Sequence, residues 1–240
     1  MRTIILYLSF AVYMLLTFFK MLKLKYLKKH SDEEKIQKYI NKIVINWANF
    51  TLRTVGIKVN KKGLENIPEG TCLFVANHQG LLDIPVVISS LGRPVGFVAK
   101  KEMLKAKILT YWMRQIKCVF IDRQNVREAI KTINEGIKNL QDGYDMLIFP
   151  EGTRSRGEKL GSFKKGSMKL AIKAKVPVVP ITIDGTYKAR EANNGWIKPA
   201  EVNFIVGKPI YVENLSREQQ GNLSEEVRNI IQDTLDEIRK

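Results

Sequence analysis

The stretch Asn77-His78-Gln79-Gly80-Leu81-Leu82-Asp83 decides the fold, because it joins a strand-like run to a helix-like run through one of the two histidines in the chain. The apolar residues 71–76 predict a buried strand. Asp83-Ile84-Pro85 predicts the start of a helix, with aspartate at the cap and proline in the first turn. His78 therefore lies in a strand-to-helix turn.

The spacing of His78 and Asp83 indicates an acid–base pair. In such a turn the Asp83 carboxylate can reach back to one imidazole nitrogen and fix the tautomer. The other nitrogen is then free to take a proton near neutral pH, as a general base does. The alternative is a turn histidine that only caps backbone groups, and a single H-x4-D match does not exclude it.

The composition favours one large domain with an anionic partner. The 240 residues are enough for one large α/β core and few for two. Forty Lys and Arg against 24 Asp and Glu give a formal charge of +16, which suits a phospholipid surface, a phosphorylated substrate, an acidic protein or nucleic acid. Cys72 and Cys118 lie in or beside strand-like runs without metal-ligand spacing, so we expect reduced core thiols and no metal site.

The N-terminal segment has the chemistry of a membrane helix. Residues 3–19 are 17 residues without a charge, and Lys20, Lys23, Lys25, Lys28 and Lys29 follow. At 1.5 Å per residue this run is about 25 Å long, just under the roughly 30 Å hydrocarbon core. Whether the helix spans the bilayer or lies in one leaflet stays open. No small-residue cleavage site follows the run, which disfavours a signal peptide.

A second helix is predicted after the cap-like turn His30-Ser31-Asp32. Its apolar residues recur at spacings of four and three: Ile36, Ile40, Ile43, Trp47 and Phe50. We therefore expect residues 1–55 to form a helical hairpin that docks on an anionic bilayer leaflet, and residues 56–240 to form the catalytic domain. The competing interpretation is that the second helix packs against the globular domain.

From residue 57 onward, short apolar runs alternate with longer mixed segments, which is typical of an α/β sheet. The fold class predicted is a mixed, largely parallel sheet flanked by helices and preceded by the hairpin. Residues 185–199 are predicted to be a surface loop. Strands are expected near 57–61, 71–76, 94–99, 118–122, 146–149, 177–183 and 202–206, and helices near 84–91, 104–115, 125–141, 164–175 and 222–239.

Further polar groups follow predicted strands, where open α/β sheets usually bind ligands. Lys100 and Arg123 each end or follow a strand, and Phe149-Pro150-Glu151-Gly152-Thr153-Arg154-Ser155 ends another in a glycine turn. The guanidinium group suits bidentate phosphate binding, so Arg123 and Arg154 suggest a phosphate clamp to which Lys100 adds a charge. Each has an ordinary alternative; Arg123, for example, could pair with Asp122 or Glu128.

Together with the strand Val176-Pro177-Val178-Val179-Pro180-Ile181-Thr182-Ile183, these motifs resemble the glycerolipid acyltransferase family with the H-x4-D motif, and most closely the 1-acylglycerol-3-phosphate acyltransferases. The resemblance covers roughly residues 70–185 and keeps the family's order and spacing. It departs at Gly80, where many members have serine, and at Cys118, where a small glycine is common.

The resemblance implies transfer of an acyl chain from a thioester to lysophosphatidic acid, giving phosphatidic acid in phospholipid biosynthesis. His78 would be the base and Asp83 its partner. The residues that match the acceptor-binding motifs are Arg123, Glu151, Gly152, Thr153 and Arg154, with Lys100 as a further cation. The donor would be acyl-ACP or acyl-CoA, with no other cofactor, and residues 108–116 could line an apolar tunnel for its chain.

The expected partners are lysophosphatidic acid, the thioester donor and an anionic membrane, with the protein held at the cytoplasmic face of the cell membrane by its N-terminal helices. Alternatives are the same chemistry on another lysophospholipid or on glycerol 3-phosphate, and a lipid-binding protein without activity. Nucleic acid is not expected as a partner, because no recognition motif or aromatic stacking platform is present.

Overall fold

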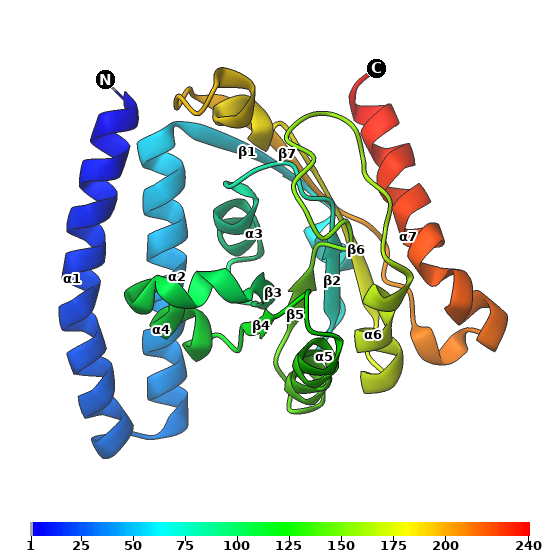
Figure 1. Cartoon of the computed structure of the whole chain (residues 1–240), viewed down its shortest axis with the longest axis horizontal. Coiled ribbons are helices and arrows are strands. Elements are labelled where there is room, and N and C mark those ends of the chain that lie inside the picture. Colours follow the sequence, from blue (N-terminus) through cyan, green and yellow to red (C-terminus); the bar gives the residue numbers. More distant parts are fainter. Residues whose placement is uncertain (1) are drawn as a thin grey trace.

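A mixed, largely parallel sheet forms the centre of the molecule, as predicted. The computed structural model describes residues 2–240, and within them the sheet has seven strands in the order β1-β7-β6-β2-β5-β3-β4 (Figure 1). Neighbouring strands are parallel except β6 and β7, which are antiparallel. The strands are β1 (Ile57–Lys62), β2 (Leu73–Ala76), β3 (Gly96–Lys100), β4 (Val119–Ile121), β5 (Met146–Ile148), β6 (Val178–Asp184) and β7 (Ala200–Val206).

Helices cover both faces of the sheet. Alternate residues of β2 enter different cores, because side chains alternate across a strand: Leu73 and Val75 join one apolar cluster, Phe74 and Ala76 the other. The Phe74 face is covered by α1 (Arg2–His30), α2 (Glu33–Val55), α3 (Asp83–Leu91) and α4 (Lys107–Gln115); the Leu73 face is covered by α5 (Val126–Gln141), α6 (Lys169–Ala174) and α7 (Arg217–Ile238) (Figure 1).

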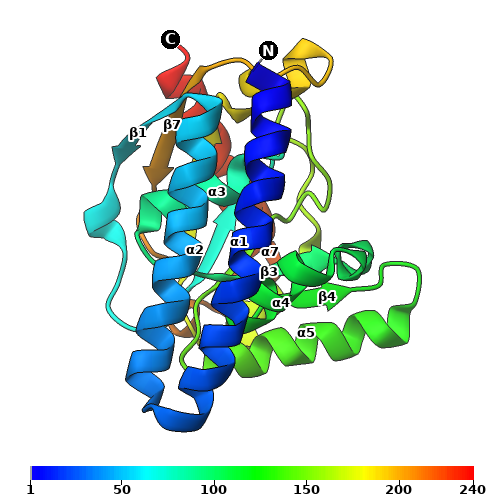
Figure 2. The same cartoon turned by 90° about the vertical axis from the view of Figure 1, so that its left-hand side faces the viewer.

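The N-terminal hairpin consists of α1 and α2, which run antiparallel and side by side (Figure 2). Asp32 caps α2 by accepting a hydrogen bond from the Lys35 amide at 2.7 Å. The apolar stripe of α2 is buried in the same cluster as the sheet, so this helix packs on the globular part. α1 lies outside α2 and keeps most of its apolar side chains exposed. The division at residues 55 and 56 falls between α2 and β1 and stays a prediction.

Three helices differ from their expected bounds. α7 begins at Arg217 and not at 222, because Ser216 and Gln219 form a capping box that the sequence analysis did not use. The expected helix 104–115 is a 3-10 helix, Lys101–Lys105, followed by α4. The expected helix 164–175 is likewise a 3-10 helix, Lys165–Met168, followed by the short α6.

Residues 185–199 connect β6 to β7 with many exposed side chains, as predicted, but the segment is not only a surface loop. The segment contains two 3-10 helices, Thr186–Ala189 and Glu191–Asn193, and several of its side chains are buried. Ala189 and Ile197 pack with Val55 of α2 and Leu82 of the His78 turn. The sequence analysis relied on the Asn, Gly, Lys and Arg content of the segment and overlooked the apolar residues Ala189 and Ile197. The segment therefore has one side packed against the His78 turn and another exposed to solvent.

Candidate active site

The predicted site residues come together because the strands that carry them are parallel neighbours. β2, β5, β3 and β4 are adjacent in that order and run in one direction, so their carboxyl ends share one edge of the sheet. His78 follows β2, Glu151 follows β5, Lys100 ends β3 and Arg123 follows β4. This edge is where parallel α/β sheets bind ligands.

His78 and Asp83 form a close pair at this edge. The distance from His78 Nδ1 to Asp83 Oδ2 is 2.6 Å, and the imidazole stacks on the Phe149 ring with centroids 4.1 Å apart. The His78 side chain keeps 19% of its surface exposed. Within residues 2–240 no hydrogen bond involves its Nε2 atom. The pair therefore has one nitrogen held by the carboxylate and one available to a ligand.

Asp83 is fully buried and held by several donors. The sequence predicted Asp83 as the N-cap of α3, but Asp83 is the first residue of the helix and Leu82 is its N-cap. Besides His78, its Oδ2 atom accepts the Gly80 amide at 2.9 Å, and its Oδ1 atom accepts the Thr186 hydroxyl. A carboxylate in the first helical turn is also favoured by the helix dipole. These contacts fix the orientation of the acid that orients the imidazole.

Glu151 joins two segments of the site through backbone amides. Its Oε1 atom accepts the His78 amide at 2.7 Å, and its Oε2 atom accepts the Gly161 amide at 2.9 Å. Burial raises the pKa of this carboxyl, while the two amide hydrogen bonds oppose the rise. Each oxygen of Glu151 thus accepts one main-chain amide, so the side chain supports the turns around the site. Its predicted contact with the acceptor stays a prediction.

The glycine turn after Glu151 lies against the His78 turn. The Ser155 amide donates to the His78 carbonyl at 2.8 Å, and the Arg156 amide donates to the Gln79 carbonyl at 3.1 Å. Arg154 therefore lies in a segment whose main chain is bonded to the His78 turn. Thr153 is exposed and, with Glu151, lines a surface hollow of about 320 Å³ that also includes Ser155 and Lys159.

Gly152 has a positive φ of 72°, which favours glycine. A Cβ atom there would lie 3.0 Å from Lys164 Nζ, and Arg123 Nη1 donates a hydrogen bond to the Gly152 carbonyl. Lys164 is a cation that the sequence analysis missed. Arg123 does not pair with Asp122, which bonds Lys101 at 2.6 Å, or with Glu128, which bonds Lys131 at 2.7 Å. Arg123 thus supports the turn with one of its five N–H donors.

The two remaining cations differ in their partners. Arg154 keeps 36% of its side chain exposed, and its Nη1 atom lies 3.6 Å from Glu191 Oε1. Lys100 is exposed, and within residues 2–240 it has no side-chain hydrogen bond or ion pair. Both groups can therefore bind an anion.

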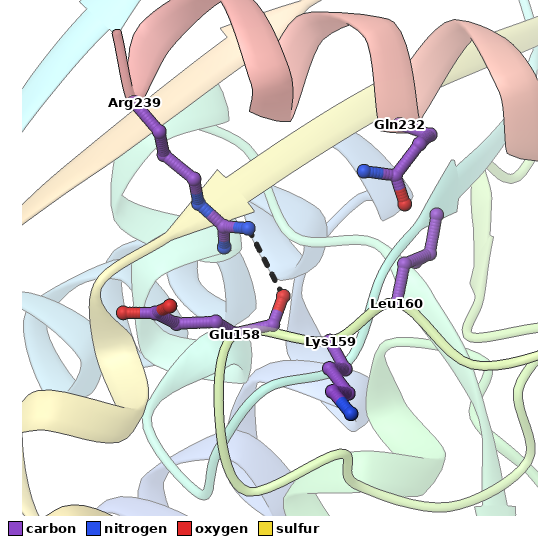
Figure 3. Close-up of a pocket in the computed structure, with 5 residues that line it drawn as sticks. All are labelled: Glu158, Lys159, Leu160, Gln232 and Arg239. Carbon is purple, nitrogen blue, oxygen red and sulfur yellow. Dashed lines mark hydrogen bonds between the residues drawn. The ribbon is translucent and has the colours of Figure 1, made fainter.

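The C-terminal helix also reaches the site. Arg239 donates to Asp184 Oδ1 at 2.6 Å and to the Glu158 carbonyl at 3.1 Å, the contact drawn in Figure 3. Asp184 also accepts the Gln79 side-chain amide at 3.1 Å, and Gln79 Oε1 accepts the Gly185 amide at 2.8 Å. Burial favours the neutral acid, but the hydrogen bonds from Arg239 and Gln79 outweigh it and lower the pKa of Asp184.

Asp184, Thr186 and Glu191 lie at or after the end of β6, and the sequence analysis assigned no site residue to that part of the chain. One signal was available: the run Asp184-Gly185-Thr186 lies at the carboxyl end of β6, as His78 lies after β2, and the two strands are neighbours in the sheet. The strand order that brings them together is not visible in a single sequence.

Comparison with known proteins identifies the family of the chain. The acyltransferase family profile matches residues 58–184. A probable 1-acyl-sn-glycerol-3-phosphate acyltransferase of Mycoplasma genitalium is 35% identical over 208 residues, 82% of this chain and 76% of that protein. The 1-acyl-sn-glycerol-3-phosphate acyltransferase of Saccharomyces cerevisiae is 36% identical over 191 residues, 77% of this chain and 62% of that protein.

The chain matches 48% of the length of the chloroplastic Brassica napus enzyme BAT2, at 34% identity and with 69% of this chain aligned, so it spans about half of that relative. The crystal structure of the 1-acyl-sn-glycerophosphate acyltransferase PlsC of Thermotoga maritima superposes with a TM-score of 0.87 at 30% identity, covering 99% of this chain and 95% of that one. The chain therefore belongs to the acyltransferase family that includes the 1-acyl-sn-glycerol-3-phosphate acyltransferases.

Proposed function

We propose that this chain transfers a fatty acyl group from a thioester donor to the sn-2 hydroxyl of 1-acylglycerol 3-phosphate, giving phosphatidic acid for phospholipid synthesis. The observation that carries the proposal is the 2.6 Å contact of His78 with buried Asp83, beside the loop that bears Arg154. The relatives described above, which are named for this activity, support the same reaction.

In the proposed step His78 Nε2 takes the proton of the acceptor hydroxyl as its oxygen attacks the thioester carbonyl carbon. The tetrahedral oxyanion then collapses, the carbon–sulfur bond breaks, and the departing thiolate takes the proton from the imidazolium. Asp83 stabilises the imidazolium formed between these events. Thr186 and the Gly80 amide hold Asp83 in place for this role.

A direct attack needs no nucleophile from the protein. The Cys72 and Cys118 thiols are buried. Burial raises the pKa of both, for Cys118 to about 12. A thiol in that state is inert, because the thiolate is the reactive form. The acceptor's own hydroxyl is therefore the nucleophile in this mechanism.

The acceptor phosphate would bind the cations at the sheet edge. Arg154 and Lys100 have free donors, and Arg123 adds positive charge beside the Gly152 turn. A phosphate held there would direct the neighbouring hydroxyl toward His78, which is the orientation effect that speeds a two-substrate reaction. Acyl-ACP or acyl-CoA would supply the acyl group, and no other cofactor enters the scheme.

We further propose that α1 anchors the protein in one leaflet. Residues Thr3–His30 form a helix that is long and apolar enough to cross a membrane. Both ends are tied to the globular part: Thr3 Oγ1 accepts the Ile197 amide at 2.9 Å, and Lys28 Nζ donates to Gln115 at 2.7 Å. Because α1 is held along the domain at both ends, we expect it to lie in the plane of an anionic leaflet, at the cytoplasmic face of the cell membrane.

The experiment that tests the function is mass-spectrometric detection of phosphatidic acid from purified protein, lysophosphatidic acid and each donor type. A panel with other lysophospholipids and glycerol 3-phosphate as acceptors would establish selectivity for the phosphomonoester. His78→Ala, with folding checked by circular dichroism, should abolish turnover. Unchanged turnover in this variant would rule out His78 as the base, and wild-type protein without turnover on any acceptor would favour lipid binding alone.

A further inference from the structure

A buried carboxylate from the segment 185–199 lies beside the candidate site. Glu191 keeps 4% of its side chain exposed. Its Oε1 atom accepts the Leu81 amide at 2.9 Å, three residues after His78. Its Oε2 atom is buried and has no hydrogen-bond partner within residues 2–240. A buried carboxylate oxygen without a hydrogen-bond partner is energetically costly, so its presence here points to a role for Glu191 beyond packing.

Glu191 fills the space that a side chain at position 80 would need. A Cβ atom on Gly80 would lie 2.8 Å from Glu191 Oε2 and 3.1 Å from its Cδ atom. Real Cβ atoms do not approach so closely, so position 80 and position 191 compete for one volume. The departure at Gly80 noted from the sequence therefore has a physical counterpart in Glu191.

The same carboxylate faces Arg154. Glu191 Oε1 lies 3.6 Å from Arg154 Nη1, and within residues 2–240 no other carboxylate lies in ion-pair distance of this arginine. The contact involves one terminal nitrogen, so the Nε and Nη2 edge stays available for a bidentate bond to phosphate. An ion pair here restricts a long, flexible side chain without occupying its binding edge.

We propose that Glu191 is a positioning residue that orients Arg154 toward the phosphate of the acceptor, and that Gly80 provides the space Glu191 requires. The inference deepens the proposed function and rests on it. Glu191 touches neither reacting atom; it acts through Arg154 and through the Leu81 amide.

Steady-state kinetics with lysophosphatidic acid test whether Glu191 orients Arg154. Glu191→Gln keeps an oxygen for the Leu81 amide and removes the charge. We expect it to raise the acceptor KM about threefold to fivefold, the size of one partly exposed ion pair, with kcat within about twofold. Arg154→Ala should raise KM further, and adding Glu191→Gln to it should change nothing more. Glu128→Gln, a surface carboxylate paired with Lys131, is the matched control.

The outcomes separate this inference from the function it rests on. Wild-type protein without acyl transfer to lysophosphatidic acid would refute the proposed function itself. With active wild type, an unchanged or lowered KM in Glu191→Gln, or an effect that adds fully to that of Arg154→Ala, would overturn the positioning role alone.

A double-mutant cycle at positions 80 and 191 tests whether Gly80 provides the space that Glu191 requires. Gly80→Ser should lower kcat/KM at least tenfold in the wild-type background, because the serine collides with the carboxylate. In a Glu191→Ala background the same serine should be tolerated, with kcat/KM within about threefold of Glu191→Ala alone. A serine that is tolerated beside Glu191, or is equally harmful without it, would refute the shared space. If Gly80→Ser alone does not fold, the double variant still reports.

Discussion

Replacement of Asp83 by asparagine is the sharpest test of the proposed mechanism. The substitution keeps the size of the side chain and removes the charge that faces the imidazolium. Asp83 is fully buried and its Oδ2 atom lies 2.6 Å from His78 Nδ1. For two unit charges centred about 4 Å apart, at an effective dielectric constant of about 20, Coulomb's law gives about 4 kcal/mol.

A loss of this size at the transition state corresponds to a fall of about 10³-fold in kcat. The assay is phosphatidic acid formation at saturating lysophosphatidic acid, with folding checked by near-UV circular dichroism. Asp122→Asn is the matched control, because that carboxylate pairs with Lys101 away from the imidazole and should leave kcat within about twofold. A folded Asp83→Asn protein that keeps more than a tenth of the wild-type kcat would refute the electrostatic argument.

Three further perturbations follow from the same contacts. Thr186→Val removes the hydroxyl bonded to Asp83 and should lower kcat by about tenfold, the effect of one hydrogen bond to a charged group, with acceptor KM little changed; an unaltered kcat would contradict this. Arg239→Gln should destabilise the fold by about 1–2 kcal/mol at neutral pH in chemical denaturation, because Asp184 loses the bond that lowers its pKa. Because the pKa of Asp184 is lower in the folded than in the unfolded protein, its ionised carboxyl stabilises the folded state at pH values above the unfolded pKa. The difference in unfolding free energy between the variant and wild type should therefore shrink as pH falls below about 4. A difference that stays constant with pH would exclude the linkage. Replacing Leu8 and Leu15 together by serine should weaken sedimentation with anionic vesicles while the protein stays folded, whereas the same change at the exposed residues Val126 and Ile130 of α5 should not.

Local patterns predicted much of the fold. Apolar periodicity predicted the positions of the strands and helices. The H-x4-D spacing predicted the contact between His78 and Asp83. The helix bounds failed where capping residues decide them, as at Ser216 of α7. Element boundaries depend on a few hydrogen bonds that composition does not reveal.

The supporting residues of the site could not be predicted because they depend on strand order. Thr186 reaches Asp83 only because β6 pairs with β2, and Glu191 reaches Leu81 because its segment folds back over the same edge. The family motif predicted that Glu151 contacts the acceptor, but it did not predict the supporting role that the structure adds, in which both oxygens accept main-chain amides. A motif identifies which side chains matter, while their roles depend on neighbours from other parts of the chain.

The hydrogen bonds that hold both ends of α1 to the globular part have a consequence for lipid distribution if the proposed anchoring in one leaflet holds. A protein that lies on one monolayer would draw its substrate from that monolayer and return its product there. On the proposed function, every turnover would enrich the near monolayer in two-chain lipid and leave the opposite one unchanged. Balanced growth of a bilayer would then require a separate process that carries phospholipid across.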